Sequence, residues 1–266
     1  MISLAGGGFT LNLAAKYKPR QLADIRGQAA AVKILKRFAE VAQHDSTPIV
    51  FLFHGPSGVG KSASAWALAG ELGCDVDDPD MSGIREIPSG QQDGAAVRQL
   101  LDSLYLRPLL GSGWKVAIIN ECDNMTPQAE AIWLDGLEKL PSKTVVIFTT
   151  NNTGRLTGRL ATRCLAIEFE GDVKKLRPSV QAMARDVWKR ETGKRLESVP
   201  TNLGVMNSLF PTISYRLALQ QLAQYIAAGA VPTAAKACEV KESATNDGSS
   251  AAKKAWETRR RKAVAK

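Results

Sequence analysis

The 266-residue sequence predicts an α/β fold, in which a parallel β-sheet is covered by helices on both faces and a smaller helical unit follows. Two patterns carry this prediction. First, four short apolar runs are typical of strands buried on both faces, at residues 49–53, 116–119, 145–148 and 166–169. Second, these runs alternate with segments whose apolar residues recur at helical spacing. Elements that alternate in this way build a parallel sheet, and such sheets bind ligands at the carboxyl ends of their strands.

The helices are predicted, in chain order, at residues 29–43, from residue 61, around residues 97–104 and at about 127–140. In the first of them, Val32, Leu35 and Phe38 repeat at the spacing of one helix face. The stretch between residues 73 and 94 is rich in Gly, Asp and Pro and is read only as a connection.

A phosphate-binding loop follows the first predicted strand. Residues 55–62 read GPSGVGKS, which matches G-x-x-x-x-G-K-[ST] at every fixed position and stands between a strand and a helix. We expect Lys61 to contact the β- and γ-phosphates of ATP, and the Ser62 hydroxyl to bind Mg²⁺. The helix that begins here turns its partly positive N-terminus toward the same anion. The predicted nucleotide-binding residues of this segment are Gly55, Pro56, Ser57, Gly58, Val59, Gly60, Lys61, Ser62 and Ala63.

Polar residues follow the next two predicted strands. After residues 116–119 comes Glu121, which we expect to orient the attacking water as a catalytic base. Asn120 stands where an aspartate is expected, so it can hydrogen-bond a Mg²⁺-bound water but adds no negative charge. After residues 145–148 comes Asn151, which can sense the γ-phosphate. The alternatives are that Glu121 caps a helix and that Asn151 belongs to a turn.

Twelve residues after Asn151, Arg163 stands within the sequence Thr162-Arg163-Cys164. An exposed arginine at this position could stabilise transition-state charge in the site of a neighbouring subunit.

Together these motifs resemble the clamp-loader branch of the AAA+ ATPases, which includes replication factor C small subunits and the polymerase III gamma/tau and delta-prime subunits. The similarity runs from about residue 13 to 225. Residues 16–19 and 25–28 resemble the family's K-Y-R-P and V-G-Q boxes, residues 55–62 its Walker A motif, and residues 115–123 its Walker B motif. Asn151 matches sensor 1 and Arg163 the arginine finger. Residues 214–219 are more weakly similar to the sensor 2 helix, which would give Arg216 a nucleotide contact.

The resemblance implies a RecA-like P-loop domain at residues 1–170 and a helical lid at residues 171–230, with ATP and Mg²⁺ bound between them. It adds Tyr17 and Pro19 to the nucleotide site. The implied partners are other clamp-loader subunits in a pentamer-like assembly, a sliding clamp and primer–template DNA. Arg98 and Arg107 fall where such subunits track the DNA backbone, although a solvated helix face is the simpler interpretation.

Charge is concentrated at the C-terminal end of the chain. The net charge is +9, and the last sixteen residues contribute +6 of it, from seven Lys or Arg against Glu257. We expect residues 231–266 to be a flexible linker with a basic tail that attracts nucleic acid through Arg259, Arg260 and Arg261, or else a solvated terminus. The composition of this segment does not predict the helical collar domain that full clamp-loader subunits carry.

Several classes of protein are disfavoured by composition. No run of 18 apolar residues predicts a membrane span, and residues 1–8 do not resemble a signal peptide. The four cysteines lie far apart with no C-x-x-C pair, which argues against a zinc site or a disulfide framework. We therefore expect no membrane partner and a cytoplasmic protein of a bacterial or phage-infected cell.

Two alternatives to an ATP-hydrolysing clamp-loader-like subunit stay open at the level of sequence. Asn120 and the missing collar favour a structural subunit that binds nucleotide and hydrolyses little. A helicase loader or a branch-migration motor is the second alternative, and the sequences at residues 16–19 and 162–164 speak against it.

Overall fold

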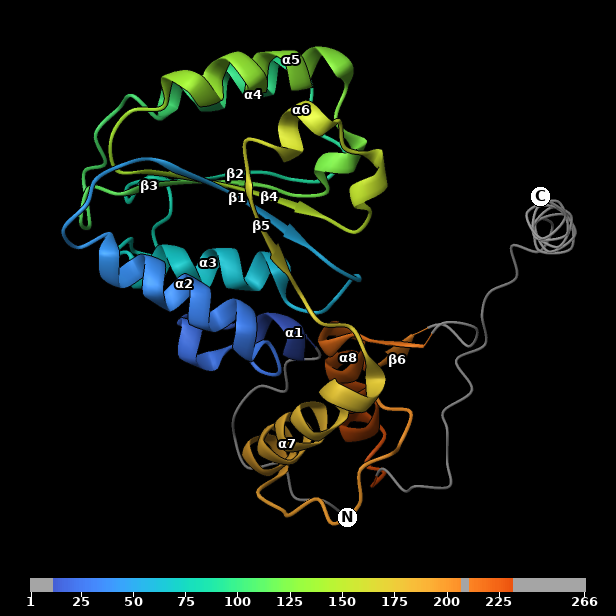
Figure 1. Cartoon of the computed structure of the whole chain (residues 1–266). Helices are drawn as coiled ribbons and strands as arrows, with labels where there is room; N and C mark the ends of the chain where they lie inside the picture. The colour runs from blue at the N-terminus through green and yellow to red at the C-terminus, as the bar shows by residue number, and fades with distance from the viewer. Residues whose placement is uncertain (1–11, 207–210, 232–266) are drawn as a thin grey trace, which may run out of the picture. The chain divides into compact units, whose positions relative to one another are not determined.

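A computed structural model describes residues 12–206 and 211–231, all of which belong to one unit that spans Met1–Ala234 (Figure 1). The predicted linker and basic tail, with Arg259, Arg260 and Arg261, lie outside the described residues.

The central element is a five-stranded parallel sheet in the order β2-β3-β4-β1-β5. Its strands are β1 (Ile49–His54), β2 (Ile84–Ile87), β3 (Lys115–Ile119), β4 (Thr144–Thr150) and β5 (Leu165–Glu168). The helices of four residues or more are α1 (Leu13–Lys16), α2 (Ala29–Val41), α3 (Lys61–Glu71), α4 (Gly94–Ser103), α5 (Pro127–Gly136), α6 (Gly158–Ala161), α7 (Val173–Thr192) and α8 (Tyr215–Ala227). The predicted fold class, a parallel α/β sheet with helices on both faces and a helical region after it, is confirmed.

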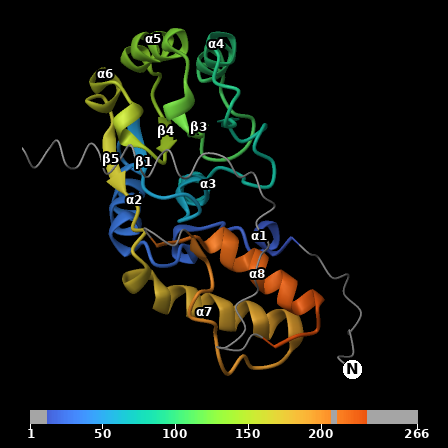
Figure 2. The ribbon, with the colours of Figure 1, turned by 90° about the vertical axis from the view of Figure 1, so that its right-hand side faces the viewer.

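Alternating strand residues divide the core into two layers, because successive side chains of a strand point to opposite faces. Phe51, Val116 and Val145 pack with α2 and α3, whereas Leu52 and Phe148 pack with α4 and α5. Figures 1 and 2 show these helix pairs on opposite sides of the sheet. The central strand β4 is buried along its whole length, as expected for a strand covered on both faces.

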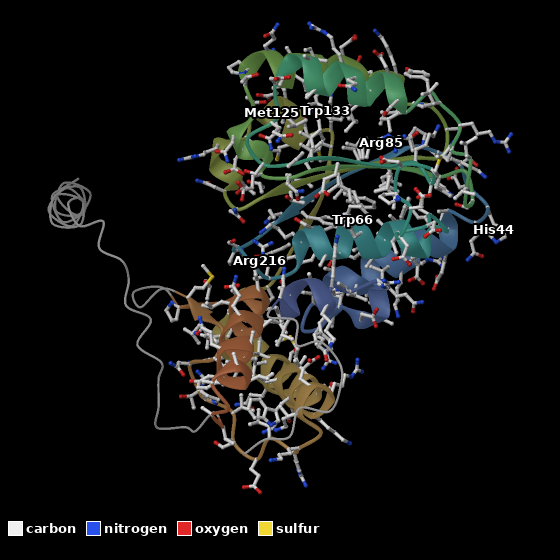
Figure 3. The ribbon with its side chains drawn as sticks, turned by 180° about the vertical axis from the view of Figure 1, so that it is seen from behind. His44, Trp66, Arg85, Met125, Trp133 and Arg216 are labelled. Carbon is white, nitrogen blue, oxygen red and sulfur yellow. The ribbon has the colours of Figure 1, made fainter. Side chains whose placement is uncertain are left out.

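Aromatic side chains anchor each layer. On the α4–α5 side, Trp133 of α5 (labelled in Figure 3) packs edge-on against Phe148, and the ring centres are 5.1 Å apart. On the other side, Phe38 of α2 packs edge-on against Phe51 at 5.2 Å. Edge-to-face contact between aromatic rings stabilises the fold beyond the effect of the apolar area that the rings bury. These pairs therefore strengthen the packing of the sheet against both helix layers.

Strand β2 is the main correction to the predicted elements, since the sequence predicts only a connection at residues 73–94. The strand has four residues and lies at the edge of the sheet, with Gly83 at φ +82° before it and Pro88 after it. Only Ile84 and Ile87 are buried, so the strand has neither a continuous apolar run nor a clear alternation. Backbone pairing with β3, rather than side-chain pattern, decides its conformation.

The region after the sheet has its own core. Leu176, Val180 and Leu222 of α7 and α8 are buried there together with Leu13 of α1. A two-stranded antiparallel ladder, β6 (Val205–Met206) with β7 (Thr212–Ile213), adds strand structure that the prediction of a purely helical lid lacked. The boundary at residue 170 stays a prediction.

Helix α7 is delimited by local signals. The Asp172 carboxylate accepts a hydrogen bond from the backbone N–H of Lys174 at its start, and Gly193 ends it in the left-handed conformation with φ +69°. Among the helices formed by residues 12–206 and 211–231, none is both long enough and apolar enough to cross a bilayer.

Candidate nucleotide-binding site

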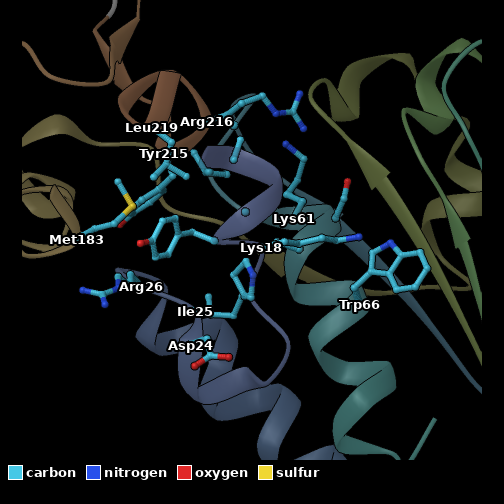
Figure 4. A pocket seen from close by; sticks show the side chains of 18 of the residues that line it. Lys18, Asp24, Ile25, Arg26, Lys61, Trp66, Met183, Tyr215, Arg216 and Leu219 are labelled. Carbon is cyan, nitrogen blue, oxygen red and sulfur yellow. The ribbon is translucent and has the colours of Figure 1, made fainter. Parts of the chain in front are cut away.

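A cavity of about 900 Å³ lies between the carboxyl ends of the central strands, the N-terminal segment and helices α7 and α8 (Figure 4). Most of the predicted nucleotide-binding and catalytic residues line it, namely Tyr17, Pro19, Ser57, Gly58, Val59, Gly60, Lys61, Ser62, Ala63, Asn120, Glu121, Asn151 and Arg216. Gly55 and Pro56 are not among the lining residues, although their carbonyl groups accept hydrogen bonds from Lys61, which lines the cavity. The fold therefore brings together residues that are up to 199 positions apart in the sequence.

The phosphate loop needs its glycines for conformation and for close approach. Gly60 adopts φ +109° immediately before α3, where an L side chain would be strained. At Gly58, with φ +76°, an added Cβ atom would lie 2.0 Å from the Ser214 hydroxyl. The Gly58 carbonyl also accepts a hydrogen bond of 2.9 Å from the backbone N–H of Tyr215. Glycine at position 58 thus lets the start of α8 touch the phosphate loop.

Lys61 is held inside the loop that precedes it. Its Nζ donates hydrogen bonds to the carbonyl oxygens of Gly55 at 2.6 Å and Pro56 at 2.7 Å, and to Oδ1 of Asn151 at 2.8 Å. Burial lowers the pKa of this lysine from 10.5 to about 8, and Arg216 adds repulsion, whereas Asp123 and Glu121 favour the charged form. A phosphate anion would supply the counter-charge that this buried ammonium group lacks.

Gln28 anchors the phosphate loop through side-chain hydrogen bonds. This residue is buried, and its Nε2 donates to the carbonyl oxygens of Val59 at 3.3 Å and Glu170 at 2.9 Å. Its Oε1 accepts the backbone N–H of Glu170 at 2.8 Å. A single amide therefore ties the N-terminal segment, the phosphate loop and the end of β5 together, which explains why a glutamine stands in the V-G-Q-like box.

Asn120 and Ser62 meet at the end of β3. The Ser62 hydroxyl donates to Oδ1 of Asn120 at 2.6 Å, and the Thr149 hydroxyl of β4 donates to the same oxygen at 3.3 Å. Asn120 Nδ2 donates to the Glu86 carboxylate, and the side chain of Gln92 donates to the Asn120 carbonyl. The amide is thus oriented by side chains from α3, β4 and β2.

Glu121 has an uncommon backbone conformation. Its φ of +52° and ψ of +52° place it in the left-handed region, which costs free energy for a residue other than glycine and is concentrated at functional sites. Its carboxylate accepts hydrogen bonds from Ser89, and from Asn124 at 3.5 Å, both on Oε2. Its backbone N–H donates to the Thr149 hydroxyl at 3.2 Å. The carboxylate lines the cavity rather than capping a helix through a side-chain hydrogen bond.

Asn151 and Asp123 are held by β4. Asn151 follows the strand and accepts a hydrogen bond from Lys61, so the predicted sensor and the phosphate-loop lysine are in direct contact. The adjacent Thr150 hydroxyl donates to Asp123 at 2.8 Å.

Arg216 enters the cavity from α8. Figure 4 shows the charged ends of Arg216 and Lys61 on the same side of the cavity, and their repulsion contributes to the lowered pKa of Lys61. Ser214 caps α8, its hydroxyl accepting the backbone N–H of Leu217 at 3.2 Å. The hydrogen bond from the Tyr215 N–H to the Gly58 carbonyl holds this end of α8 beside the phosphate loop. An anion in the cavity would lie between two cations that come from separate parts of the fold.

The N-terminal segment lines the opposite wall. The Tyr17 hydroxyl donates to Glu191 of α7 at 2.5 Å, and burial together with this hydrogen bond raises the pKa of Tyr17 to about 12. Glu191 also pairs with Lys16 at 2.7 Å. The Nζ of Lys18 lies 4.0 Å from the ring centre of Trp66, a cation–π contact at the edge of the same cavity.

The oxygen groups of Ser62, in the first turn of α3, and of Asn120, directly after β3, match the chemistry of Mg²⁺, which prefers oxygen ligands and keeps several waters. The Ser62 hydroxyl would bind the ion directly, and Asn120 would hold one of its waters. Among the described residues no group of three or more His, Cys, Asp or Glu could hold a metal ion by itself. The residues therefore fit an ion that arrives with nucleotide phosphates and has most of its ligands supplied by them and by water.

Three predicted functional arginines lie outside this cavity. Arg163 follows α6 and pairs with Glu138 at 2.7 Å. Arg98 of α4 lines a separate surface groove with residues of α5, and Arg107 is exposed in the connection after α4. The position of Arg163 is consistent with action outside its own site.

Sequence reasoning missed several residues that line the cavity or hydrogen-bond the backbone of residues that do. Glu86, Ser89 and Gln92 come from β2 and the loop after it, and Trp66 from α3. The first three belong to residues 73–94, for which the sequence predicts only a connection, so no pattern identifies them. One signal could have drawn attention to Glu86: it is a charged residue near the carboxyl end of a strand, where ligands of parallel sheets bind.

Comparison with known proteins now decides the family. The sequence model of the family described as "DNA polymerase III, delta subunit" matches residues 30–172, more than half of the chain. The chain belongs to this family. The prediction of the clamp-loader branch of the AAA+ ATPases is confirmed by this match and by relatives among the replication factor C subunits.

The replication factor C small subunit of Picrophilus torridus is 28% identical over 156 residues, which are 58% of this chain and 47% of that protein. The large subunit of Methanosarcina mazei is 28% identical over 159 residues, which are 59% of this chain and 25% of that protein. The chain thus spans half or less of the length of these relatives.

The RuvB Holliday junction branch migration motor of Thermotoga maritima superposes with a TM-score of 0.60 at 19% identity, over 81% of this chain and 68% of that chain. At this identity the likeness establishes the AAA+ fold alone.

Proposed function

We propose that this chain is a clamp-loader-like subunit that binds and hydrolyses ATP and acts with other such subunits on a sliding clamp and primer–template DNA. The observation that carries the proposal is the convergence of Lys61, Ser62, Glu121 and Asn151 on one cavity, with Arg216 entering from α8. Family membership supports ATPase chemistry in general, and the geometry supports this particular set of residues.

Each residue has a role that its surroundings support. Lys61 exchanges its carbonyl partners for the β- and γ-phosphates, and the N-terminus of α3 adds partial positive charge. Glu121 orients the attacking water, because a carboxylate accepts the water's proton as the bond to phosphorus forms. Asn151 bridges Lys61 to the γ-phosphate, which allows it to report whether that phosphate is present. Mg²⁺, when bound, would neutralise phosphate charge at Ser62.

Arg163 is proposed to complete the site of a neighbouring subunit. It is partly exposed, and its guanidinium group is bound to Glu138 and to the carbonyl of Arg159 at 3.1 Å. Both contacts are on the surface, so a stronger anion on an adjacent subunit can replace them at small cost.

A structural subunit with little hydrolysis is the second candidate, and Asn120 is the observation that favours it. An amide in place of a carboxylate at this position weakens the hold on Mg²⁺. Turnover then depends on whether another group supplies the charge.

Two measurements on the purified chain test the proposal: ATP turnover with and without primer–template DNA, and the native mass of the protein. We expect DNA-stimulated turnover in an oligomer. Glu121→Gln should bind ATP normally and lose turnover by roughly 100-fold or more, since it keeps the shape but not the base. Tight ATP binding without turnover under any condition would favour the structural subunit, and absence of ATP binding would refute both candidates.

A further inference from the structure

Asn120 carries no negative charge, but Glu86 on the neighbouring strand β2 does. Glu86 lies near the end of β2, and its Oε1 accepts a hydrogen bond from Nδ2 of Asn120. In the ladder between β2 and β3, Glu86 is opposite Ile118, two residues before Asn120. Because side chains alternate along a strand, Glu86 and Asn120 leave the sheet on the same face. Both line the nucleotide cavity.

The hydrogen-bond network fixes the orientation of the Asn120 amide. Its Oδ1 accepts the hydroxyl groups of Ser62 and Thr149, at 2.6 and 3.3 Å. Its other end faces Glu86, and an ionised carboxylate can only accept a hydrogen bond, so Nδ2 must be the atom at that end. An aspartate at position 120 would place two carboxylates in contact, and like charges repel. Asn120 and Glu86 are therefore complementary, and a single residue change at either position would disturb the pair.

We propose that Glu86 supplies, through Asn120, the negative charge that retains the Mg²⁺ ion of the bound nucleotide. This inference rests on the proposed function, since the ion enters with ATP. Glu86 is a positioning residue: it polarises the Asn120 amide, whose Oδ1 is shared with the Ser62 hydroxyl, and its charge lies in the same cavity. Partners beyond the direct ligands of a metal commonly change its affinity by about 10- to 100-fold.

A simpler role for Glu86 would be to neutralise Lys18, a cation that lines the same cavity. The pKa of Lys18 is lowered by burial, and Glu86 opposes that shift. However, Lys18 and Glu86, both among the described residues, form no ion pair within 4.0 Å, whereas Glu86 accepts a hydrogen bond from Asn120. The contact with Asn120 is thus the stronger of the two observations.

The test uses the full chain and measures the Mg²⁺ concentration at half-maximal ATP binding by calorimetry. Glu86→Gln, which keeps the shape and removes the charge, should raise this concentration roughly 10-fold. Its ATP affinity in excess EDTA should stay within about twofold of wild type. Glu71→Gln is the matched control, because Glu71 is exposed at the end of α3 and does not line the cavity. It should leave both values unchanged.

A second substitution distinguishes compensation from a general loss of structure. Asn120→Asp in the Glu86→Gln background places the negative charge at position 120 instead and should restore the wild-type Mg²⁺ dependence. An unchanged Mg²⁺ dependence in Glu86→Gln, or failure of Asn120→Asp to restore it, would overturn the role of Glu86 while ATP binding stands. A wild-type protein that binds no ATP, with Mg²⁺ or in EDTA, would overturn the proposed function as well.

Discussion

Lys61 and Arg163 are both cations with expected roles at the γ-phosphate, yet their surroundings are opposite. Lys61 is 7% exposed, bound by two carbonyl groups and Asn151, and its pKa falls because it is buried. The Arg163 side chain is 38% exposed and pairs with Glu138, itself 63% exposed.

The difference indicates which parts of the site are built before ATP arrives. Lys61 is preorganised inside one chain, so its contribution to binding needs no partner. Arg163 is held only by surface contacts, which are worth little, so little free energy opposes the role proposed for it at an adjacent subunit. A lysine suits the first place because its ammonium group is compact, and an arginine the second because its planar fork binds phosphate oxygens in pairs.

Arg163→Ala gives the largest expected effect and tests the exposed half of this comparison. Turnover in the assembled protein should fall by about 1000-fold or more, since an arginine finger contributes on that scale to phosphoryl transfer. ATP binding by the monomer should not change. Arg159→Ala removes an exposed arginine from α6 in the same segment and is the matched control. Steady-state turnover and ATP calorimetry on the three proteins make the measurement.

Mixing Arg163→Ala with Lys61→Ala protein sharpens this test. One chain then offers an intact arginine and the other an intact pocket, so part of the turnover should return where the two meet. No recovery in assemblies shown by mass to contain both chains would contradict action between subunits.

Lys61→Ala tests the other side of the comparison, the buried cation. ATP affinity should fall by about 100-fold, which corresponds to the loss of a charge-assisted hydrogen bond worth about 3 kcal/mol. The thermal stabilisation that ATP gives to wild type should largely disappear, because stabilisation by a ligand depends on its concentration relative to its Kd. Undiminished stabilisation would place ATP somewhere other than the phosphate loop.

The contrast between predicted and unpredicted parts of the site has a physical basis. The phosphate loop could be predicted because a tight anion-binding turn between strand and helix demands glycines and a lysine at fixed spacing. The contacts of Glu86 with Asn120 and of Gln28 with Glu170 could not, since their partners lie 34 and 142 residues away. Sequence order does not state which strands are neighbours, and β2 lacks the apolar pattern that would have revealed it.

The pairing of Arg163 with Glu138 was also beyond the sequence. The motif around Arg163 makes the residue a candidate, but Glu138, in the 3-10 turn Leu137–Lys139, meets it only in the folded chain.

The final and smallest expected effect is a pH dependence of ATP binding that we assign to Lys61. In the ATP-free protein burial lowers the pKa of Lys61 to about 8, so above that pH the group is increasingly neutral. ATP needs the charged form, and binding must then take up a proton. ATP affinity should therefore be nearly constant below pH 8 and fall up to about 10-fold per pH unit above it. Lys61→Arg, whose side chain stays charged, should bind ATP with less affinity but without this slope between pH 8 and 9.5. Calorimetric titrations of both proteins across that range are the measurement. Equal slopes would mean that the titrating group is not Lys61 and that its charge is maintained by the residues around it.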